Sequence, residues 1–476
     1  MSKEAVLDAA VLAKLPPEWP EELLPTIQAG LEAAAKTRNE KVVILDDDPT
    51  GTQTVQDIPV LTSWSVEELK AELSGDSLAF FILTNSRSLN EGQACLLAEE
   101  IGANLFRAAR ECGVKLVLIS RSDSTLRGHF PAEVDRMAAV TDQANRPYLV
   151  YPFFQEGGRY TFNDIHYVRE GDTLVPAAQT PFARDAAFGF SSSNLRDWVT
   201  EKTGARLARE TVQSVSIEDI RLGGPEKVAE KLLTVKPGSA CVVNSVSYRD
   251  AEVVVAALLA AEQAGAEFLF RTAASFVRTR LGQPYHEQRL TSKEIVADNR
   301  NGGLFVIGSY VEKTSRQVEA LFVQTDIARV MVDVASLLDE SVREQEMNAC
   351  RSKCEELLKA GRDVALYTSR KLIVGHNAKE SLEIGQSISD GLIGIVGSIS
   401  VQPRYLVAKG GITSSDVATK ALKVRRAMVI GQPLPGVPAW RLGEESRYPG
   451  MVYIVFPGNV GSDEALAELK KNLESR

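Results

Sequence analysis

The chain has 476 residues, of which 44% are hydrophobic and 25% charged, a composition typical of a soluble globular enzyme. Its net charge of −9 and the lack of a basic cluster argue against non-specific nucleic-acid binding. No segment approaches the roughly 18 apolar residues of a membrane span, and the acidic residues near the N-terminus are unlike a signal peptide.

The order of predicted elements indicates an α/β protein. Strands alternate with helices from residue 41 onward, which predicts βαβ units and a mainly parallel sheet. Because 476 residues exceed the usual single core, we expect two domains, each built on a mainly parallel sheet flanked by helices. The predicted boundaries are an N-terminal arm at 1–40, a first domain at 41–280, a linker at 281–303 and a second domain at 304–476.

Apolar runs give the approximate elements of both domains. In the first domain, strands are expected within 42–45, 78–85, 114–120, 147–154, 239–246 and 267–271, with a helix over 91–112. In the second, strands are expected within 303–309, 328–334, 363–369, 404–411 and 451–461, with helices over EKTSRQVEALFVQ, from TSSDVATKAL and at the C-terminus.

Three consecutive aspartates, Asp46, Asp47 and Asp48, follow the first strand. Adjacent carboxylates repel one another, so they favour a place with a metal, a cationic partner or a proton to be moved. Ligands of open α/β sheets bind at this carboxyl edge. A solvated acidic turn would carry the same residues, but we interpret the cluster as a site.

Polar loops follow two further strands of the first domain. The strand at 114–120 continues into RSDSTLRGH, which supplies Arg121, Ser122, Asp123, Ser124, Thr125 and Arg127. Guanidinium groups recognise a carboxylate at two points, and hydroxyls complete the hydrogen bonds of a polyol. The strand at 78–85 leads into Arg87, which by itself could equally be a surface residue. Together the three strand ends predict a small, anionic, hydroxylated ligand.

The stretch EGGRYTFNDIHYV adds Arg159 and His166 as candidate ligand contacts. A lone histidine is more often structural, so His166 is a weak catalytic candidate. Five scattered cysteines fit a reducing cytoplasm. Cys350 and Cys354 are four residues apart on a predicted helix with no third ligand nearby, so we expect buried small side chains and not zinc ligands.

Glycine turns follow three strands of the second domain. Gly410 and Gly411 stand between a strand and a helix whose N-cap is expected at Thr413 or Ser414. Such glycines let the backbone approach a phosphate, and the helix start supplies N–H donors. The turns at 308–309 and 457–461 end two other strands, so together they describe a nucleotide cradle. Neither GxxxxGK[ST] nor GxGxxG is present.

The motifs LDDDPTGTQ, SRSDSTLRGH, EGGRYTFNDIHYV, GSY, AKGGITSSDVATKAL and FPGNVG resemble, in this order, those of the four-carbon acid sugar kinase family. The resemblance runs from about residue 41 to the C-terminus. It implies an ATP-dependent kinase of threonate, erythronate or 3-oxo-tetronate. It also implies an N-terminal sugar-binding domain and a C-terminal nucleotide-binding domain, both α/β.

The resemblance also implies roles for individual residues. Asp47 and Asp48 match the family's aspartate pair, Arg87 the arginine after the second strand, and Arg121–Ser124 the substrate loop. The ATP-binding positions are Ser309, Gly410, Gly411, Ile412, Thr413 and Gly458. The chain departs from the family in its extra N-terminal arm, in the first motif at Pro49 and Gln53, and in GGITS in place of GGET.

The implied cofactors are ATP and Mg²⁺, and the implied partner is a small-molecule sugar acid. The arginines would clamp the substrate carboxylate, and either Asp47 or Asp48 would accept the proton of the attacking hydroxyl. The magnesium ligands and a homodimer are left open. The alternative is a haloacid-dehalogenase-like phosphatase, because Asp46-x-Asp48-x-Thr50 fits its DxDxT signature. Such an enzyme also needs a later acidic pair, which the sequence does not offer.

Overall fold

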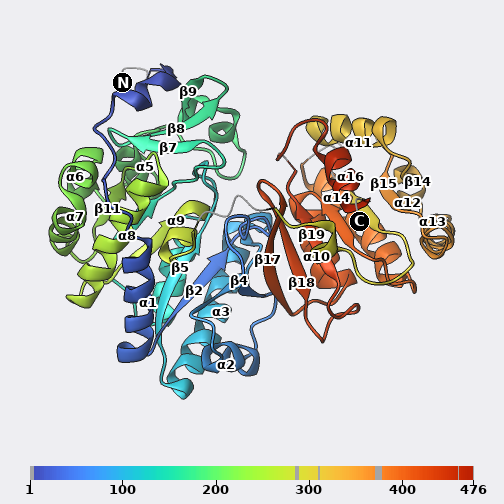
Figure 1. Ribbon diagram of the computed structural model, residues 1–476, viewed down its shortest axis with the longest axis horizontal. Coiled ribbons are helices and arrows are strands. Elements are labelled where there is room, and N and C mark those ends of the chain that lie inside the picture. Colours follow the sequence, from blue (N-terminus) through green and yellow to red (C-terminus); the bar gives the residue numbers. More distant parts are fainter. Residues whose placement is uncertain (1–4, 285–288, 309–310, 370–377, 459, 475–476) are drawn as a thin grey trace. The chain divides into compact units, whose positions relative to one another are not determined.

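The computed structural model describes residues 5–284, 289–308, 311–369, 378–458 and 460–474 (Figure 1). The chain divides into two compact units. Unit 1 comprises Met1–Val55 and Ser63–Tyr285, and unit 2 comprises Gln56–Thr62 and His286–Arg476. The predicted α/β class with mainly parallel sheets is confirmed. Among the described residues, no helix is long and apolar enough to cross a membrane.

Unit 1 is built on a parallel sheet with the strand order β10-β11-β6-β12-β5-β2-β4. The strands are β10 (Val212–Val215), β11 (Ala240–Val243), β6 (Tyr148–Tyr151), β12 (Leu269–Thr272), β5 (Lys115–Arg121), β2 (Glu40–Asp46) and β4 (Ala79–Leu83). Every residue of β2 and β4 is buried. A parallel strand that is buried at every position needs helices on both faces of its sheet.

Two groups of helices supply that cover. One group packs α2 (Val66–Ser74) on α3 (Glu91–Cys112) and α3 on α4 (Ala132–Val140). The other packs α1 (Leu24–Arg38), α6 (Ile217–Arg221), α7 (Gly224–Leu233) and α9 (Ala274–Arg280) around α8 (Tyr248–Gln263). In a core cluster, Trp198 of α5 (Leu195–Lys202) stacks on Phe130 with the ring centroids 5.1 Å apart.

A second, antiparallel sheet in unit 1 has the strand order β1-β9-β8-β7. Its strands are β1 (Leu7–Asp8), β9 (Thr173–Pro176), β8 (Ile165–Glu170) and β7 (Arg159–Phe162). Through β1 and through α1, which packs on α8, the segment predicted as an arm joins unit 1. Short 3₁₀-helices complete the unit at Ala9–Lys14, Ser86–Ser88, Ala177–Gln179, Pro181–Arg184 and Arg209–Thr211.

Unit 2 has a mixed sheet with the strand order β3-β17-β18-β19-β16-β13-β15-β14. The strands are β3 (Ile58–Leu61), β17 (Arg426–Leu434), β18 (Val437–Leu442), β19 (Val452–Phe456), β16 (Leu406–Lys409), β13 (Leu304–Ile307), β15 (Val364–Thr368) and β14 (Ala328–Val332). Pairing is antiparallel from β3 to β19 and parallel from β19 to β14. The antiparallel part was not predicted from the sequence.

The helices of unit 2 are α10 (Ser292–Ile295), α11 (Glu312–Gln324), α12 (Val334–Leu338), α13 (Arg343–Lys359), α14 (Ala378–Ser398), α15 (Gly411–Asp416), a π-helical turn at Val417–Ala421, and α16 (Ala465–Glu474). Ile295 of α10 belongs to the core of this unit, so part of the segment predicted as a linker packs against it. Cys350 and Cys354 are buried on α13, as predicted. The domain boundaries given above remain a prediction.

Candidate functional site

The carboxyl edge of the unit 1 sheet brings the three predicted polar segments together. Strand β2 pairs in parallel with β5 and β4, so Asp46 lies opposite Arg121 on one side and Leu83 on the other. The residues that follow the three strands therefore leave the sheet at the same level. At this edge Arg121 and Ser122 contact the aspartates, and so does Arg87.

Asp46 and Arg121 form a buried ion pair at the base of the site. Arg121 Nη1 lies 3.0 Å from Asp46 Oδ1, and the two residues are only 5% and 1% exposed. Burial raises the pKa of Asp46 to about 7, against the lowering effect of Arg121. Gly51 leaves room for this carboxylate, because a Cβ at that position would lie 1.9 Å from Asp46 Oδ2.

Asp47 has one carboxylate oxygen without a hydrogen-bond partner among the described residues. Its Oδ2 accepts a hydrogen bond of 3.0 Å from Ser122 Oγ, whereas its buried Oδ1 has no hydrogen-bond partner among the described residues. Arg121 Nη1 lies 3.8 Å from that Oδ1. Gly128, at φ +119°, passes close by, since a Cβ there would lie 3.3 Å from Asp47 Oδ2.

Asp48, Arg87 and Asp123 form a continuous chain of ion pairs. Arg87 pairs with Asp48 and, at 3.3 Å, with Asp123. Burial opposes the charged form of Asp48, but Arg87 and hydrogen bonds from Thr50 outweigh it and hold the pKa of Asp48 below its ordinary value. Burial also raises the pKa of Asp123, yet Arg87 and Arg127 hold it well below its ordinary value. Both carboxylates are thus ionised and already paired.

Arg127 and Arg159 face one aromatic ring. The guanidinium carbons of Arg127 and Arg159 lie 5.0 and 5.9 Å from the ring centroid of Phe182. Arg127 is paired with Asp123 at 2.8 Å and with Asp185 at 3.6 Å. Arg159 donates to the backbone carbonyl of Gly157 and makes no ion pair with a carboxylate of the described chain. Burial lowers the pKa of Arg159. Because Arg87, Arg121 and Arg127 each pair with an aspartate, Arg159 is the arginine of this group whose charge is least compensated.

His166 supports the loop from within the protein. It is fully buried, and its Nε2 lies 2.7 Å from the carbonyl oxygen of Ser124 while its Nδ1 lies 2.8 Å from Thr161 Oγ1. Burial lowers the pKa of His166 to about 4, so the ring is neutral. Neutral imidazole can donate through Nε2 and accept through Nδ1. His166, predicted as a substrate contact, therefore holds Ser124 in place and has no ring nitrogen left for a ligand.

Arg271, at the carboxyl end of β12, is a second support that the sequence reasoning missed. It is 1% exposed, and its Nη2 donates to the carbonyl oxygens of Asp123 and Arg127, both at 2.9 Å. Its guanidinium lies 5.6 Å from the ring centroid of Trp198. An arginine at the end of an otherwise apolar strand was the available sequence signal.

Replacing Arg271 with methionine is expected to loosen residues 122–128. The change keeps the bulk over Trp198 but removes the hydrogen bonds that Arg271 donates to the carbonyls of Asp123 and Arg127, at a cost of about 1–3 kcal/mol. The amide of Leu126, which donates to Asp123 at 3.2 Å, should exchange faster in hydrogen-exchange mass spectrometry. Arg206→Met, at an arginine whose side chain is 53% exposed, is the matched control. Unchanged exchange in Arg271→Met would contradict the support.

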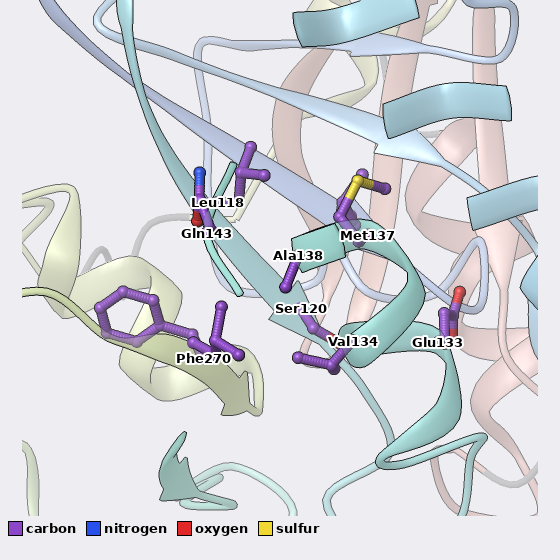
Figure 2. A pocket seen from close by; sticks show the side chains of 10 residues that line it. Leu118, Ser120, Glu133, Val134, Met137, Ala138, Gln143 and Phe270 are labelled. Atoms are coloured by element: carbon purple, nitrogen blue, oxygen red, sulfur yellow. The ribbon is translucent and has the colours of Figure 1, made fainter. Parts of the chain in front are cut away.

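A small cavity lies behind this edge, between α4 and the sheet (Figure 2). It is lined mainly by apolar side chains, among them Leu118, Met137 and Phe270, together with Glu133. Its volume is about 30 Å³, which is room for about one water molecule. Burial raises the pKa of Glu133 to about 7. The cavity is too small for the hydroxylated anion predicted above.

In unit 2 the predicted glycine turns follow β13, β16 and β19, which are neighbours in the sheet. A Cβ on Gly308 would lie 2.6 Å from Thr413 Oγ1, and Gly410, at φ +115°, has a backbone that favours glycine. Helix α15 begins at Gly411 with Gly410 as its N-cap, so the predicted cap at Thr413 or Ser414 is wrong.

The remaining predicted cofactor-binding residues have varied surroundings. Ile412 is 59% exposed. Gly458 is half-buried, and a Cβ there would meet no atom within 4 Å. Ser309 lies outside the described residues. Across the described part of the chain, no group of three or more His, Cys, Asp or Glu side chains is arranged to hold a metal ion.

Comparisons with known proteins match the two halves of the chain to two different kinds of domain. A model of sugar-binding N-terminal domains matches residues 42–280, and a model of nucleotide-binding C-terminal domains matches residues 304–466. The chain is 26% identical over 403 residues to the D-threonate kinase of Salmonella typhimurium, a match that covers 81% of this chain and 86% of that protein.

Two solved structures share the fold. A Salmonella typhimurium protein described as a putative tRNA synthase has a TM-score of 0.64 at 14% identity, covering 91% of this chain and 99% of its own. A Haemophilus influenzae protein has a TM-score of 0.60 at 17% identity, covering 90% and 100%. The two domain matches span most of the sequence, in the order that the motifs indicated. The chain therefore belongs to the four-carbon acid sugar kinase family.

Proposed function

We propose that the protein is an ATP-dependent kinase that phosphorylates a hydroxyl group of a four-carbon sugar acid of the threonate, erythronate or 3-oxo-tetronate type. The observation that carries the proposal is the cluster of arginines, hydroxyls and aspartates at the carboxyl edge of the unit 1 sheet. It lies in the domain that matches sugar-binding domains, and the same chain carries a nucleotide-binding domain. Similarity to a D-threonate kinase supports the substrate class.

Recognition of the acid would depend on charge that the protein leaves uncompensated. Arg87 and Arg121 form ion pairs with aspartates. Arg127 forms ion pairs with both Asp123 and Asp185. Arg159 has only a backbone acceptor, so a substrate carboxylate would gain most there. The nearby hydroxyls of the 121–127 loop would bind the hydroxyl groups of the substrate.

Asp47 is the better general base of the two aspartates. Asp48 is held by Arg87 and Thr50, and its lowered pKa makes it a poor proton acceptor. Asp47 Oδ1 has no hydrogen-bond partner among the described residues, so it can take the proton of the attacking hydroxyl. A base must lie within hydrogen-bond reach of that proton, and Ser122 holds the Asp47 carboxylate in position through its other oxygen.

Magnesium and ATP complete the proposal. Mg²⁺ is commonly bound by one or two carboxylates together with substrate phosphates, which fits a protein without a complete metal cage in its described part. When bound, the ion would neutralise charge on the phosphates. The glycine turns of unit 2 would hold the nucleotide. The cytoplasm as compartment and a homodimer remain predictions from the sequence.

The phosphatase alternative requires Asp46 as an exposed nucleophile. Asp46 is instead 1% exposed, paired with Arg121 and packed against Gly51. Burial also raises the pKa of Asp46, which disfavours the ionised form that a nucleophilic carboxylate needs. The structure therefore gives this alternative no support.

A screen of four-carbon acids with ATP tests the proposal. The threonate and erythronate isomers and 3-oxo-tetronate are each incubated with enzyme, ATP and Mg²⁺, and release of ADP is followed in a coupled assay. One acid should give a strong signal, and release should require that acid. Hydrolysis of phosphorylated acids without consumption of ATP would instead favour the phosphatase alternative.

A further inference from the structure

Lys409 is a buried lysine at the end of β16, immediately before the Gly410 turn. It is fully buried, and its register partners are Ile307 of β13 and Phe456 of β19. It therefore stands where the three glycine turns leave the sheet. Neither the motif resemblance nor the comparisons assign it a role.

The partners of the Lys409 ammonium group are unusual for a buried charge. Nζ donates to the carbonyl oxygens of Pro457 and Gly458, at 2.5 and 3.0 Å, and lies 4.3 Å from the ring centroid of Phe456. No carboxylate of the described residues pairs with it. Buried charges are normally paired with an opposite charge. The Lys409 ammonium group is instead held by carbonyl dipoles and an aromatic face alone. Its third N–H remains for another acceptor.

The neighbouring elements provide no carboxylate that pairs with Lys409. Strand β13 carries no titratable residue, and Tyr453 of β19 donates its hydroxyl to the carbonyl of Ser414. Asp416 of α15 pairs with Lys420 at 2.9 Å. From α11, the positive charge of Lys313 acts on Lys409. Within the described part of the chain, no negative charge pairs with Lys409, so its surroundings favour the binding of an anion.

We propose that Lys409 is the cationic group of the nucleotide site, fixing the 457–458 turn through two hydrogen bonds and providing the charge that the phosphates of the nucleotide neutralise. The inference rests on the proposed function and identifies which charge in unit 2 responds to the polyphosphate. Lys409 acts here as a positioning residue, because its bonds to the turn shape the surface that the phosphates approach.

A change in the protonation of Lys409 on nucleotide binding can be measured. Burial lowers the pKa of Lys409 to about 7 in the free protein, and Lys313 lowers it further. A bound polyphosphate favours the charged form, so it raises this pKa. Binding at pH 8, above the pKa of Lys409 in the free protein, should therefore be accompanied by a net uptake of protons. Because the pKa is higher in the complex, this contribution to affinity is complete below about pH 7 and is lost as the pH rises through the pKa of the complex.

Titration calorimetry with ATP and the full-length protein at pH 8, in two buffers of different ionisation enthalpy, measures this uptake. Lys409→Met should abolish it and weaken ATP binding by roughly 10- to 100-fold, the range for a hydrogen bond to a charged group. Lys409→Arg, which stays charged, should restore affinity without uptake. Lys353→Met, at an exposed helical lysine paired with Glu356, is the matched control and should behave as the wild type.

Three outcomes are decisive. Proton uptake by the wild type that disappears in Lys409→Met supports the inference. ATP binding by the wild type without uptake overturns it but leaves the proposed function intact, and this holds even if Lys409→Met fails to fold. Absence of ATP binding in the wild type overturns the proposed function and this inference together.

Discussion

Replacing Asp47 with asparagine should lower kcat by roughly 10²–10⁴-fold, the range typical of losing a general base, with little change in KM. The amide keeps the size of the side chain and can still accept the hydrogen bond that Ser122 Oγ donates to Oδ2. What it loses is the basic oxygen that has no hydrogen-bond partner among the described residues. Steady-state rates of ADP release with the best acid measure the effect.

Asp48→Asn is the matched control for this prediction. Asp48 is tied to Arg87 and Thr50, so its loss should disturb the position of Arg87 and raise KM more than it lowers kcat. If Asp48→Asn were inactive and Asp47→Asn active, the assignment of the base would be reversed. If only Asp46→Asn were inactive, with the other two variants active, the kinase mechanism proposed above would fail.

Local signals explain which parts of the fold could be predicted. Helix α3 runs from Glu91 to Cys112 as expected, because Asn90 forms a capping box at its start and Gly113 adopts φ +67° at its end. Such caps are encoded by neighbouring residues. The antiparallel strands of unit 2 were missed for the opposite reason. Strand β3 (Ile58–Leu61) pairs with β17 (Arg426–Leu434), and a pairing over this separation leaves no periodic signal in either segment.

The candidate site shows the same limit. The sequence predicted that Arg121 lies at the sheet edge, since polar loops after parallel strands share that edge. The sequence could not show that Arg121 forms an ion pair with Asp46. It also could not show that His166 and Arg271 support the loop through backbone carbonyls. Carbonyl acceptors exist at every residue, so a contact to them leaves no trace in residue identity. Residue types predicted the place of the site, and packing decided which groups remain free.

Gly51→Ala should disrupt the site as strongly as the loss of the base. The added Cβ would lie 1.9 Å from Asp46 Oδ2 and 2.1 Å from Oδ1, far inside contact distance. Asp46 cannot move away easily, because Arg121 pairs with it in the protein interior. Overpacking of this kind costs about 1–3 kcal/mol. Thermal unfolding followed by circular dichroism should show a lower midpoint, and kcat should fall because Asp47 follows Asp46 directly in the chain.

A double-mutant cycle separates this steric cause from general damage to the turn. Asp46→Ala removes the carboxylate that the new methyl group would meet, so adding Gly51→Ala to it should cost much less than in the wild type. Gly75→Ala is the matched control, since Gly75 has φ −75° and its Cβ would approach Ala71 O no closer than 3.4 Å. Equal costs of Gly51→Ala in both backgrounds would show that Asp46 is not the obstacle. A wild-type midpoint and kcat in Gly51→Ala would refute the packing of the aspartate turn described here.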